Sequence, residues 1–331
     1  MAVYRKSCSE SKRDIARYHL DEKEEEAENI ISTVAYRWGK LLDAGISMEP
    51  GDFAKHYWAV AASFPHTSKT ENGSLEKLPL ELWHDLFLHL DMYSLIKFRQ
   101  TCLQSRELVE SLPEYQRVAS MANHTGGLDL FWALFRTGLA ADVTLFEFHS
   151  ALCTKDCAFC GNFAPFICLL PWKRCCLKCI NSAPQAELQE LEEVQKLFKL
   201  TKTESKQLRS IKTIPGSYGL DGAVYESSLT VVSTEQVRSI LRRRKDFDIR
   251  KKLDFGWPRI RLNFVGVCKL PYYDNHTGRF EQGLTCHGCH KETLFTRDGF
   301  LEHFQSCDGA LSIWKCKALK IKAQKHLNSK G

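Results

Sequence analysis

Eight cysteine and histidine side chains of this 331-residue chain fall into two sets whose spacing suits a bound metal ion. In the first set, Cys157 and Cys160 are separated by two residues, and after fifteen more residues Cys176 and Cys179 repeat that spacing. Two intervening residues let one tight turn present both sulfur atoms, and Gly161 frees the backbone to curl around them. Zinc prefers four such soft ligands in a tetrahedron. We therefore predict a structural Zn²⁺ ion held by Cys157, Cys160, Cys176 and Cys179.

The second set combines three cysteines with one histidine. Cys286 and Cys289 again lie two residues apart, and after thirteen more residues His303 precedes Cys307 by four positions. The pattern of residues 297–306 predicts a helix, on which positions four apart project from the same face. We therefore predict a second structural Zn²⁺ ion, held by Cys286, Cys289, His303 and Cys307.

Other residues near the two sets could take the place of a ligand. Cys153 and Cys175 are close enough in sequence to substitute for a neighbour in the first set. His287 and His290 compete in the second, although each sits beside a cysteine, where the geometry for a shared ion is poor. Gly288, inside the second turn, favours a tight bend. The alternative to either site is a group of buried free thiols, or a helix with incidental Cys and His.

The fourteen cysteines also bear on the compartment and on catalysis. The basic N-terminal residues are followed by no apolar stretch, which argues against a secretory signal and favours the reducing cytoplasm or nucleus. The longest nearly apolar run, Phe163 to Trp172, is far too short to cross a bilayer, so we expect no membrane association. Closed four-ligand zinc sites are structural, and no motif for nucleotide binding or hydrolysis is present. We therefore expect a protein that is not an enzyme.

The segments around the two sets must position the ligands, and their patterns predict short helices and strands. Apolar spacing predicts two helices between Leu128 and Leu152, the first ending near Gly138, and a small hairpin between the paired cysteines of the first set. Further along, we predict an amphipathic helix over Ala186 to Leu200, a strand over Leu229 to Val232, a helix that begins with a capping box of Ser233 and Gln236, and a half-buried strand over Arg259 to Phe264.

The stretch from Leu78 to Val118 has the pattern of three short helices in close succession. In the first helix the apolar residues form a stripe, made of Leu82, Leu86 and Leu90 and widened by Trp83 and Phe87. Ser94 is the expected N-cap of the second helix, and Pro113 is the expected end of the third. Three helices of ~10 residues make a thin core, so this segment needs a neighbour to cover it.

The order of residues in this stretch is more specific than that of a generic helical bundle. It resembles an F-box at Leu78-Pro79, Glu81-Leu82, Leu90-Asp91, Ser94-Leu95, Phe98-Arg99 and Thr101-Cys102. The alternative is an ordinary helical hairpin within a larger core. The resemblance implies docking onto the Skp-family adaptor of a cullin–RING ubiquitin ligase, through a face formed or supported by Leu78, Pro79, Leu82, Leu95 and Phe98.

From about Leu78 to Trp314 the chain resembles a family of F-box proteins common in filamentous fungi. The segments that carry this resemblance include SLPEYQRV, ALFRTGLA, Arg174 to Cys179 and Gly299 to Cys307. Pro165 departs from it, because the family usually has glycine there. The resemblance implies a substrate receptor, which binds the adaptor with one part and an unknown target protein with the remainder. Ubiquitin transfer would then be performed by the cullin and RING subunits.

A zinc-finger protein that binds nucleic acid is the competing class of function. Residues 238–265 hold ten basic and three acidic side chains, a local sum of +7 in a chain whose formal charge is +6. Such a stretch suits nucleic acid, an acidic partner or an import receptor, and we take Arg242 to Lys252 as its solvated face. Against nucleic acid, the helix predicted over residues 297–306, which we call the finger helix, carries Asp298 and Glu302 and few basic residues that could contact phosphates.

The fold class expected from these patterns is mainly α with small β elements (α+β), with an N-terminal three-helix F-box and a zinc-stabilised C-terminal region. The expected domains are residues 1–74 as a partly disordered N-terminal extension, 75–120 as the F-box, 121–200 as a helical linker with the four-cysteine site, 201–316 as an α+β region with the second zinc site, and 317–331 as a basic tail.

Overall fold

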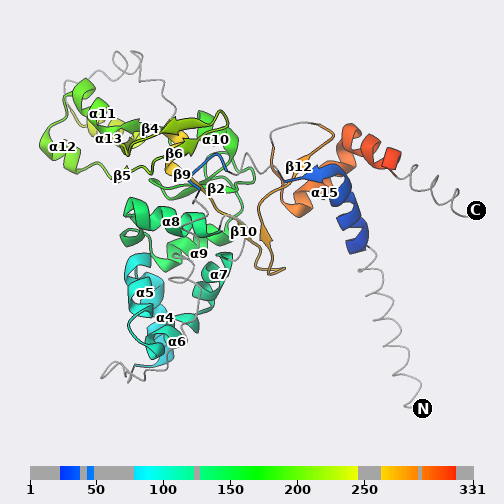
Figure 1. Ribbon diagram of the computed structural model, residues 1–331, viewed down its shortest axis with the longest axis horizontal. Coiled ribbons are helices and arrows are strands. Elements are labelled where there is room, and N and C mark those ends of the chain that lie inside the picture. The colour runs from blue at the N-terminus through cyan, green and yellow to red at the C-terminus, as the bar shows by residue number, and fades with distance from the viewer. Residues whose placement is uncertain are drawn as a thin grey trace, which may run out of the picture. The chain divides into compact units, whose positions relative to one another are not determined.

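The computed structural model describes residues 23–37, 43–47, 78–122, 127–244, 262–289 and 293–317. About half of these residues are helical, and the strands form small antiparallel sheets. The expected class, mainly α with small β elements, is therefore confirmed. The chain folds into two compact units, which we call the central unit (Gly39–Gln282) and the terminal unit (Met1–Trp38 with Gly283–Gly331) (Figure 1).

Four consecutive helices begin the helical part of the central unit. They are α4 (Leu80–His89), α5 (Met92–Arg99), α6 (Leu103–Glu110) and α7 (Pro113–Met121). The first three match the predicted helices. Pro113 also starts α7, since a proline in the first turn sacrifices no helical hydrogen bond. The cap predicted for the second helix is wrong: Asp91 is the N-cap, and its carboxylate accepts the N–H of Ser94 at 2.8 Å.

The inner face of α4 is aromatic. Trp83 and Phe87 are 3% and 0% exposed, and their ring centroids lie 5.5 and 5.4 Å from that of Phe98. Leu82 and Leu86 lie on an adjoining face that points to solvent, because they are 55% and 46% exposed. The predicted single stripe is therefore wrong in one respect. The helix has two apolar faces, and periodicity alone does not tell which of them packs against the core.

Two further helices lead to the first cysteine set, as predicted. They are α8 (Gly127–Thr137) and α9 (Leu145–Cys153). The residue after α8, Gly138, has a φ of 81°, the left-handed conformation that glycine adopts readily at helix ends. A capping box of Thr144 and Glu147 begins α9. Phe131 and Phe148 stack with ring centroids 5.2 Å apart, which joins the two helices.

A three-stranded antiparallel sheet lies beside the first cysteine set. Its order is β3 (Lys173–Cys175), β2 (Phe166–Cys168), β9 (Val267–Lys269), and β2 with β3 forms the predicted hairpin. The strand predicted over Arg259 to Phe264 is wrong where it is described, because Leu262–Gly266 form a 3₁₀ helix, η4. Leu262 and Val265 are both buried. Phe264 and Gly266 are buried as well, so burial does not alternate over η4 as it would along a half-buried strand.

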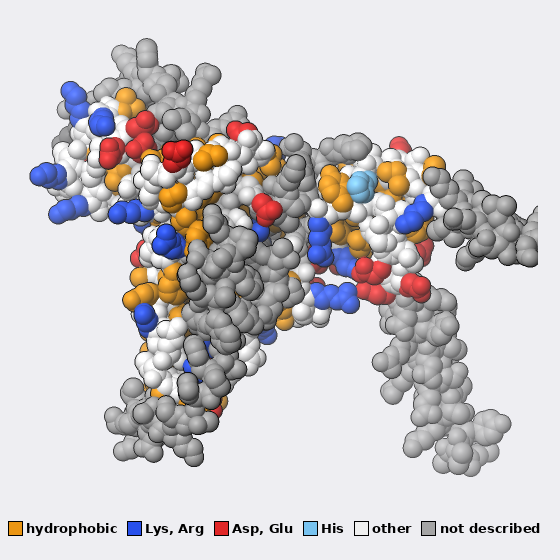
Figure 2. Space-filling model, in the orientation of Figure 1, with side chains coloured by type: hydrophobic (Ala, Val, Ile, Leu, Met, Phe, Trp, Pro, Cys, Tyr) orange, Lys and Arg blue, Asp and Glu red, His pale blue; other side chains and the backbone are white. Residues whose placement is uncertain are grey.

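A second antiparallel sheet has three helices nearby, of which the first and the third pack against it. The sheet order is β4 (Leu188–Glu190), β8 (Thr230–Ser233), β5 (Ser210–Lys212), and the nearby helices are α11 (Leu191–Phe198), α12 (Lys202–Lys206) and α13 (Thr234–Arg242). Val194, Phe198, Val232, Val237 and Leu241 belong to its buried apolar core. The helix predicted from Ala186 is therefore wrong over its first residues, because strand pairing with β8 occupies them. Figure 2 shows side chains of both charge signs mixed over α11 to α13.

The start of α13 differs from the prediction. Ser233 is the N-cap, but its side chain accepts no capping hydrogen bond, and the amide oxygen of Gln236 accepts the N–H of Arg209 at 3.0 Å. The predicted capping box is therefore wrong. The remaining elements of the central unit are short, namely α10 (Leu177–Ser182), the hairpin of β6 (Gly216–Tyr218) and β7 (Ala223–Tyr225), and the hairpin of β10 (Tyr272–Tyr273) and β11 (Phe280–Glu281).

Segments far apart in the sequence build the terminal unit. A helix through residues 23–34 leads into β1 (Ala35–Tyr36), which pairs antiparallel with β12 (Thr285–Cys286). The predicted finger helix is confirmed as α15 (Arg297–Ser306), and residues 308–317 form a further helix.

The core and the surface of the terminal unit both join these segments. Val34 is fully buried and packs in one apolar cluster with Phe300 and Phe304. On the surface, the Arg297 guanidinium lies 2.9 Å from a carboxylate oxygen of Glu24 and 3.1 Å from one of Glu28. Residues 23–37 are thus an integral part of the fold around the second cysteine set.

Some expectations concern residues outside the described ranges. These are residues 1–22 and 48–77 of the N-terminal extension, residues 245–261 of the basic stretch, and residues 318–331 of the tail. The domain boundaries stay a prediction. Within the described ranges, no helix combines the length and the apolar character that a membrane span requires.

Candidate metal centres and docking face

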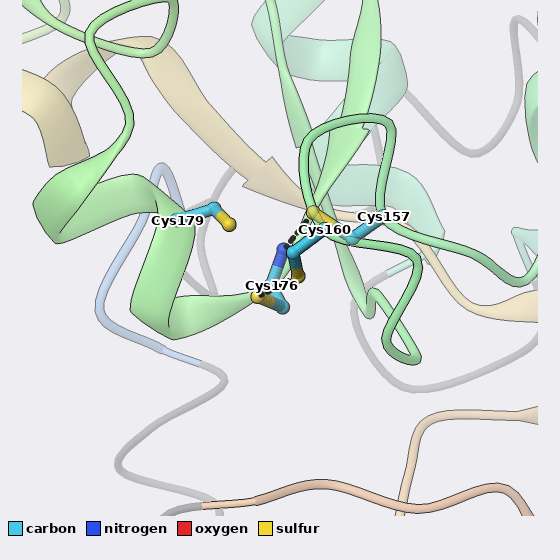
Figure 3. A group of neighbouring side chains, drawn as sticks. All are labelled: Cys157, Cys160, Cys176 and Cys179. Atoms are coloured by element: carbon cyan, nitrogen blue, oxygen red, sulfur yellow. Dashed lines mark hydrogen bonds between the residues drawn. The ribbon is translucent and has the colours of Figure 1, made fainter.

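The first cysteine set comes together at one point of the central unit. The Sγ atoms of Cys157, Cys160, Cys176 and Cys179 all lie within 4.8 Å of one another (Figure 3). A tetrahedral ion with Zn–S bonds of ~2.3 Å would place its ligand sulfurs about 3.8 Å apart. The Sγ atoms of Cys160 and Cys176 are separated by 3.6 Å. The cluster therefore fits an ion of this kind.

Local structure explains why these four side chains converge. Cys157 and Cys160 flank a turn after α9, which is closed by Gly161 with a φ of 76°. Cys176 is the N-cap of α10, and Cys179 lies in the first turn of that helix. The backbone N–H of Cys176 donates to Sγ of Cys157 at 3.4 Å. The turn and the helix start thus face each other, and each supplies two sulfurs.

Burial and hydrogen bonding shift the pKa values of three of these thiols. It raises the pKa of Cys176 to about 11 and raises that of Cys179 as well, because a thiolate loses its hydration there. The exposed Cys160 behaves differently, since the N–H of Asn162 lowers its pKa to about 7. Because a metal ion binds thiolates, an ion bound by this cluster would release protons on binding, and its affinity would fall as the pH falls.

The two competing cysteines of this region lie outside the cluster of four. Cys175 is on β3, where its Sγ is 2.8 Å from that of Cys168. Cys153 ends α9, where its Sγ is 3.4 Å from Nε2 of His149. The structure thus groups the four predicted cysteines and gives these two other neighbours.

The second set also converges, in the terminal unit. The ligand atoms of Cys286, Cys289, His303 and Cys307 all lie within 4.8 Å of one another. Cys289 Sγ is 3.5 Å from His303 Nε2, and the Sγ atoms of Cys286 and Cys307 are 3.9 Å apart. Tetrahedral zinc would give about 3.5 Å and 3.8 Å for these two kinds of pair. Phe295 stacks on the imidazole of His303 with ring centroids 4.6 Å apart, which fixes its orientation.

Residues 34–36 support this second centre, a role that the sequence did not predict. Ala35 is the strand partner of Cys286, and the N–H of His287 donates to the carbonyl of Val34 at 2.9 Å. The His287 ring packs at a tilt against the ring of Tyr36, with 4.3 Å between centroids, and His287 does not belong to the cluster. His290 lies outside the described residues. The apolar spacing of residues 30–34 predicts a helix but carries no sign of its distant partner.

Two glycines bring the second cysteine turn against the start of the helix through residues 308–317. A Cβ added at Gly288 would overlap the backbone of Gly309 and Ala310, and one added at Gly309 would overlap Gly288. Gly288 is therefore needed for a close backbone approach. We expected Gly288 to allow a tight bend, but its φ is not positive. Its role is to leave room for the neighbouring backbone.

We expect Gly288→Ala to weaken metal binding at the second centre by at least about tenfold, because the added methyl group overlaps the backbone of Gly309 and Ala310 and pushes the turn of Cys286 and Cys289 away from Cys307. The measurement is the metal content of the purified chain during titration with a chelator. Gly216→Ala is the matched control, since its added Cβ makes an ordinary 3.6 Å contact with Tyr218. Unchanged metal retention in Gly288→Ala would contradict this role.

A buried arginine ties the first centre to the rest of the central unit. Arg174 is 3% exposed and donates to the carbonyl oxygens of Ala151, Leu152, Ala164, Leu270 and Pro271. Burial lowers its pKa to about 9, so the guanidinium keeps its charge at pH 7. These five bonds use the five N–H donors of the side chain. Arg174 thereby joins the end of α9, the residues before β2 and the residues after β9.

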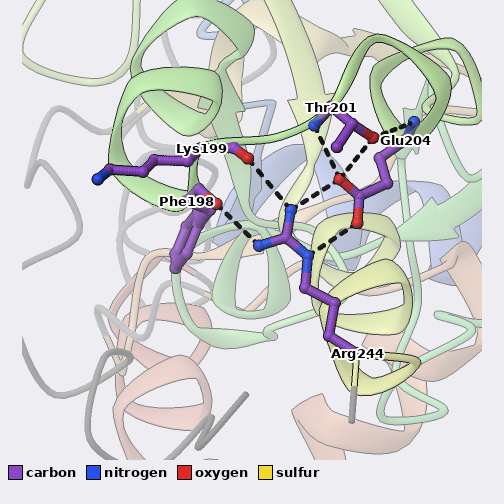
Figure 4. Close-up of polar contacts among 5 residues, drawn as sticks. All are labelled: Phe198, Lys199, Thr201, Glu204 and Arg244. Atoms are coloured by element: carbon purple, nitrogen blue, oxygen red, sulfur yellow. Dashed lines mark hydrogen bonds and ion pairs between the residues drawn. The ribbon is translucent and has the colours of Figure 1, made fainter. Parts of the chain in front are cut away.

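The described part of the basic stretch is largely ion-paired. The Arg244 guanidinium donates to both carboxylate oxygens of Glu204, at 2.8 and 2.7 Å, and to the carbonyls of Phe198 and Lys199 (Figure 4). This partner lowers the pKa of Glu204 to about 2. The predicted solvated face is therefore wrong for Arg244, which links the end of α11 to α12. Arg238 and Arg242 also contact acidic side chains, those of Glu187 and Glu235.

The predicted docking residues divide into an exposed group and a supporting group. Leu78 and Leu82 are 39% and 55% exposed, and Pro79 between them is also exposed. Phe98 is partly buried, and Leu95 is 0% exposed, so Leu95 supports the face without reaching a partner. Leu82 and Leu86 lie one turn apart on α4, and the exposed Leu78 precedes that helix. Together they form the leucine stripe, an exposed apolar surface of the kind that marks an interaction site.

Comparison with known protein families matches this segment. The F-box domain is found over residues 75–117, which contain α4 to α6 and the leucine stripe. Neither the comparison with curated proteins nor the comparison with solved structures gives a match. The likeness to F-box proteins of filamentous fungi stays a prediction. The chain thus carries an F-box domain, followed toward its C-terminus by two Cys/His clusters that fit a cysteine-rich zinc-binding region.

Proposed function

We propose that this protein is the substrate receptor of a Skp–cullin–F-box ubiquitin ligase. The observation that carries the proposal is the position of the leucine stripe, which lies exposed on the segment that matches the F-box. F-box domains bind Skp-family adaptors. The adaptor would connect the chain to the cullin and RING subunits, and the remainder of the chain would hold a target protein. We expect the protein to act in the cytoplasm or the nucleus.

In this function the chain itself performs no bond chemistry. F-box proteins are in general non-catalytic adaptors. Both metal clusters offer four protein ligands, and such closed sites are structural. We propose that each holds one Zn²⁺ ion, which stabilises the fold around it. The first ion would stiffen the region between α9 and α10, and the second would hold the terminal unit together.

Charge in the terminal unit argues against the competing function of nucleic-acid binding. Its described residues include seven acidic side chains and five Lys or Arg side chains, a net formal charge of −2. Phosphate binding depends on an excess of Lys and Arg. Three of the arginines of α13 and the two residues after it, namely Arg238, Arg242 and Arg244, form ion pairs with glutamates. No observation on the described residues favours that function.

The adaptor interface gives the first test. We expect Pro79→Ala combined with Leu82→Ala to abolish co-purification with a Skp-family adaptor, because both side chains are exposed and lie on the docking face. The metal content of the chain should stay unchanged. The measurement is pull-down of the purified adaptor by wild-type and variant chains.

Leu197→Ala is the matched control for this test. Leu197 is 42% exposed on α11, away from the F-box segment, so adaptor binding should persist in this variant. Retained adaptor binding in the Pro79/Leu82 double variant would refute the docking face.

A further inference from the structure

A groove in the central unit lies beside the first metal centre. It encloses about 480 Å³, within the ~300–1,000 Å³ range of ligand pockets. The hairpin end at Pro171 and Trp172 and the turn at residues 156–158 contribute one part of its lining. The other part is one face of α9, formed by residues at intervals of three and four, namely Glu147, Ser150, Ala151 and Thr154.

The dimensions of the groove suit an extended peptide. Residues 147–154 of α9 and its end cover about 10 Å, at 1.5 Å per helical residue. An extended chain advances ~3.3 Å per residue, so about three residues fit along this wall. Ser150 and Ala151, in the middle of the wall, are small and leave room for a backbone.

Two large apolar side chains stand at the lining of this groove. Phe146 is 60% exposed. Trp172 has a φ of 48°, a conformation that is unusual for a bulky residue and that concentrates at binding sites. Its indole N–H donates to the carbonyl of Glu147 at 3.3 Å, and its ring centroid lies 5.8 Å from that of Phe148. The indole is thus fixed in place before any ligand arrives.

The charges of the lining disfavour phosphorylated ligands. Glu147 and Asp156 are balanced by Lys173 and Arg174, but Arg174 spends its donors on backbone carbonyls. Among the described lining residues, Lys173 is then the one cation that can donate to a ligand. Phosphorylated segments are recognised by clusters of arginine. A phosphate in this groove would meet one lysine and two carboxylates, which disfavours it.

We propose that this groove binds a short, unphosphorylated segment of the target protein in an extended conformation. A large apolar side chain of that segment packs against Phe146 and Trp172. The proposal rests on the proposed function, since it assigns the recognition of the target to a particular part of the receptor. Because Cys157 also belongs to the lining, the first metal centre would hold one part of the groove in place.

The test uses the full chain and a synthetic library of random seven-residue peptides on beads, half of which carry a phosphoserine. Binding to wild type is compared with binding to Ser150→Arg, whose long side chain fills the groove from an exposed position. We expect the peptides that only the wild type retains to share a Phe, Trp, Leu or Met and to lack phosphoserine. The Kd of the tightest peptide is then measured by fluorescence anisotropy.

Phe146→Ala should raise that Kd at least about tenfold, as expected for loss of an aromatic anchor. Leu197→Ala, which removes an apolar side chain that is 42% exposed on α11, should leave it unchanged. The proposal is overturned if no peptide distinguishes wild type from Ser150→Arg, if phosphoserine peptides dominate the distinguishing set, or if Phe146→Ala binds as tightly as wild type. Adaptor pull-down of each variant separates these failures from a failure of the receptor function.

Discussion

Cys289→Ser is expected to lower the zinc content from two equivalents per chain to one and to unfold the terminal unit. Binding of structural zinc contributes on the order of 10 kcal/mol to the folding of a small module. The whole stability of a domain is only about 5–15 kcal/mol. Because Val34, Phe300 and Phe304 share one core with the ligands Cys286 and Cys307, loss of the ion should release residues 23–37 together with residues 283–317.

Three measurements check this expectation on one preparation. Elemental analysis counts the zinc, hydrogen exchange reports the opening of both segments, and pull-down reports adaptor binding, which should persist because the F-box segment lies in the central unit. Cys316→Ser is the matched control, since Cys316 is an exposed cysteine of the same unit that does not belong to the cluster. Protection of residues 23–37 that survives the loss of one zinc equivalent would contradict the predicted coupling.

Arg174→Met is expected to destabilise the central unit nearly to the point of unfolding. The methionine roughly keeps the volume of the side chain but leaves five carbonyl oxygens without their donor. A buried polar group without a partner costs about 1–3 kcal/mol. Even at the lower figure the sum is about 5 kcal/mol, which is comparable with the whole stability of many domains.

Urea unfolding followed by circular dichroism measures this effect. Lys155→Met provides the matched control, because Lys155 is an exposed cation in the same region and its replacement should change the unfolding free energy by less than about 0.5 kcal/mol. Arg174→Lys should recover only part of the loss, since an ammonium group has three donors instead of five. A loss below about 1 kcal/mol in Arg174→Met would mean that water replaces the guanidinium at little cost.

The sequence predicted those parts of the fold that depend on residues close together in the chain. The ligand pairs two residues apart, the hairpin between them and the helix that carries His303 each depend on local spacing. Their convergence within 4.8 Å follows from that spacing. The F-box segment could be recognised because its residues follow a specific order over about forty positions.

The parts that the sequence did not predict depend on distant partners or on which of two faces is buried. Leu82 and Leu86 have the spacing of a core stripe, but they are exposed because Trp83 and Phe87 fill the core instead. Residues 188–190 continue a helical pattern, yet they pair with β8 some forty positions later. Arg174 donates to five backbone carbonyls from three separate segments, and the periodicity of side chains does not predict such contacts.

The pairing of β1 with β12 has a consequence for the way the protein is made. Ala35 pairs with Cys286, about 250 residues later in the chain. Ribosomes add roughly 5–20 residues per second, so β1 leaves the ribosome between about 13 and 50 s before its partner strand does. During that interval the two residues of β1 lack the strand that pairs with them, and the apolar core that Val34 shares with Phe300 and Phe304 cannot form. The terminal unit can therefore fold only after the segment from Cys286 to Cys307 has been translated.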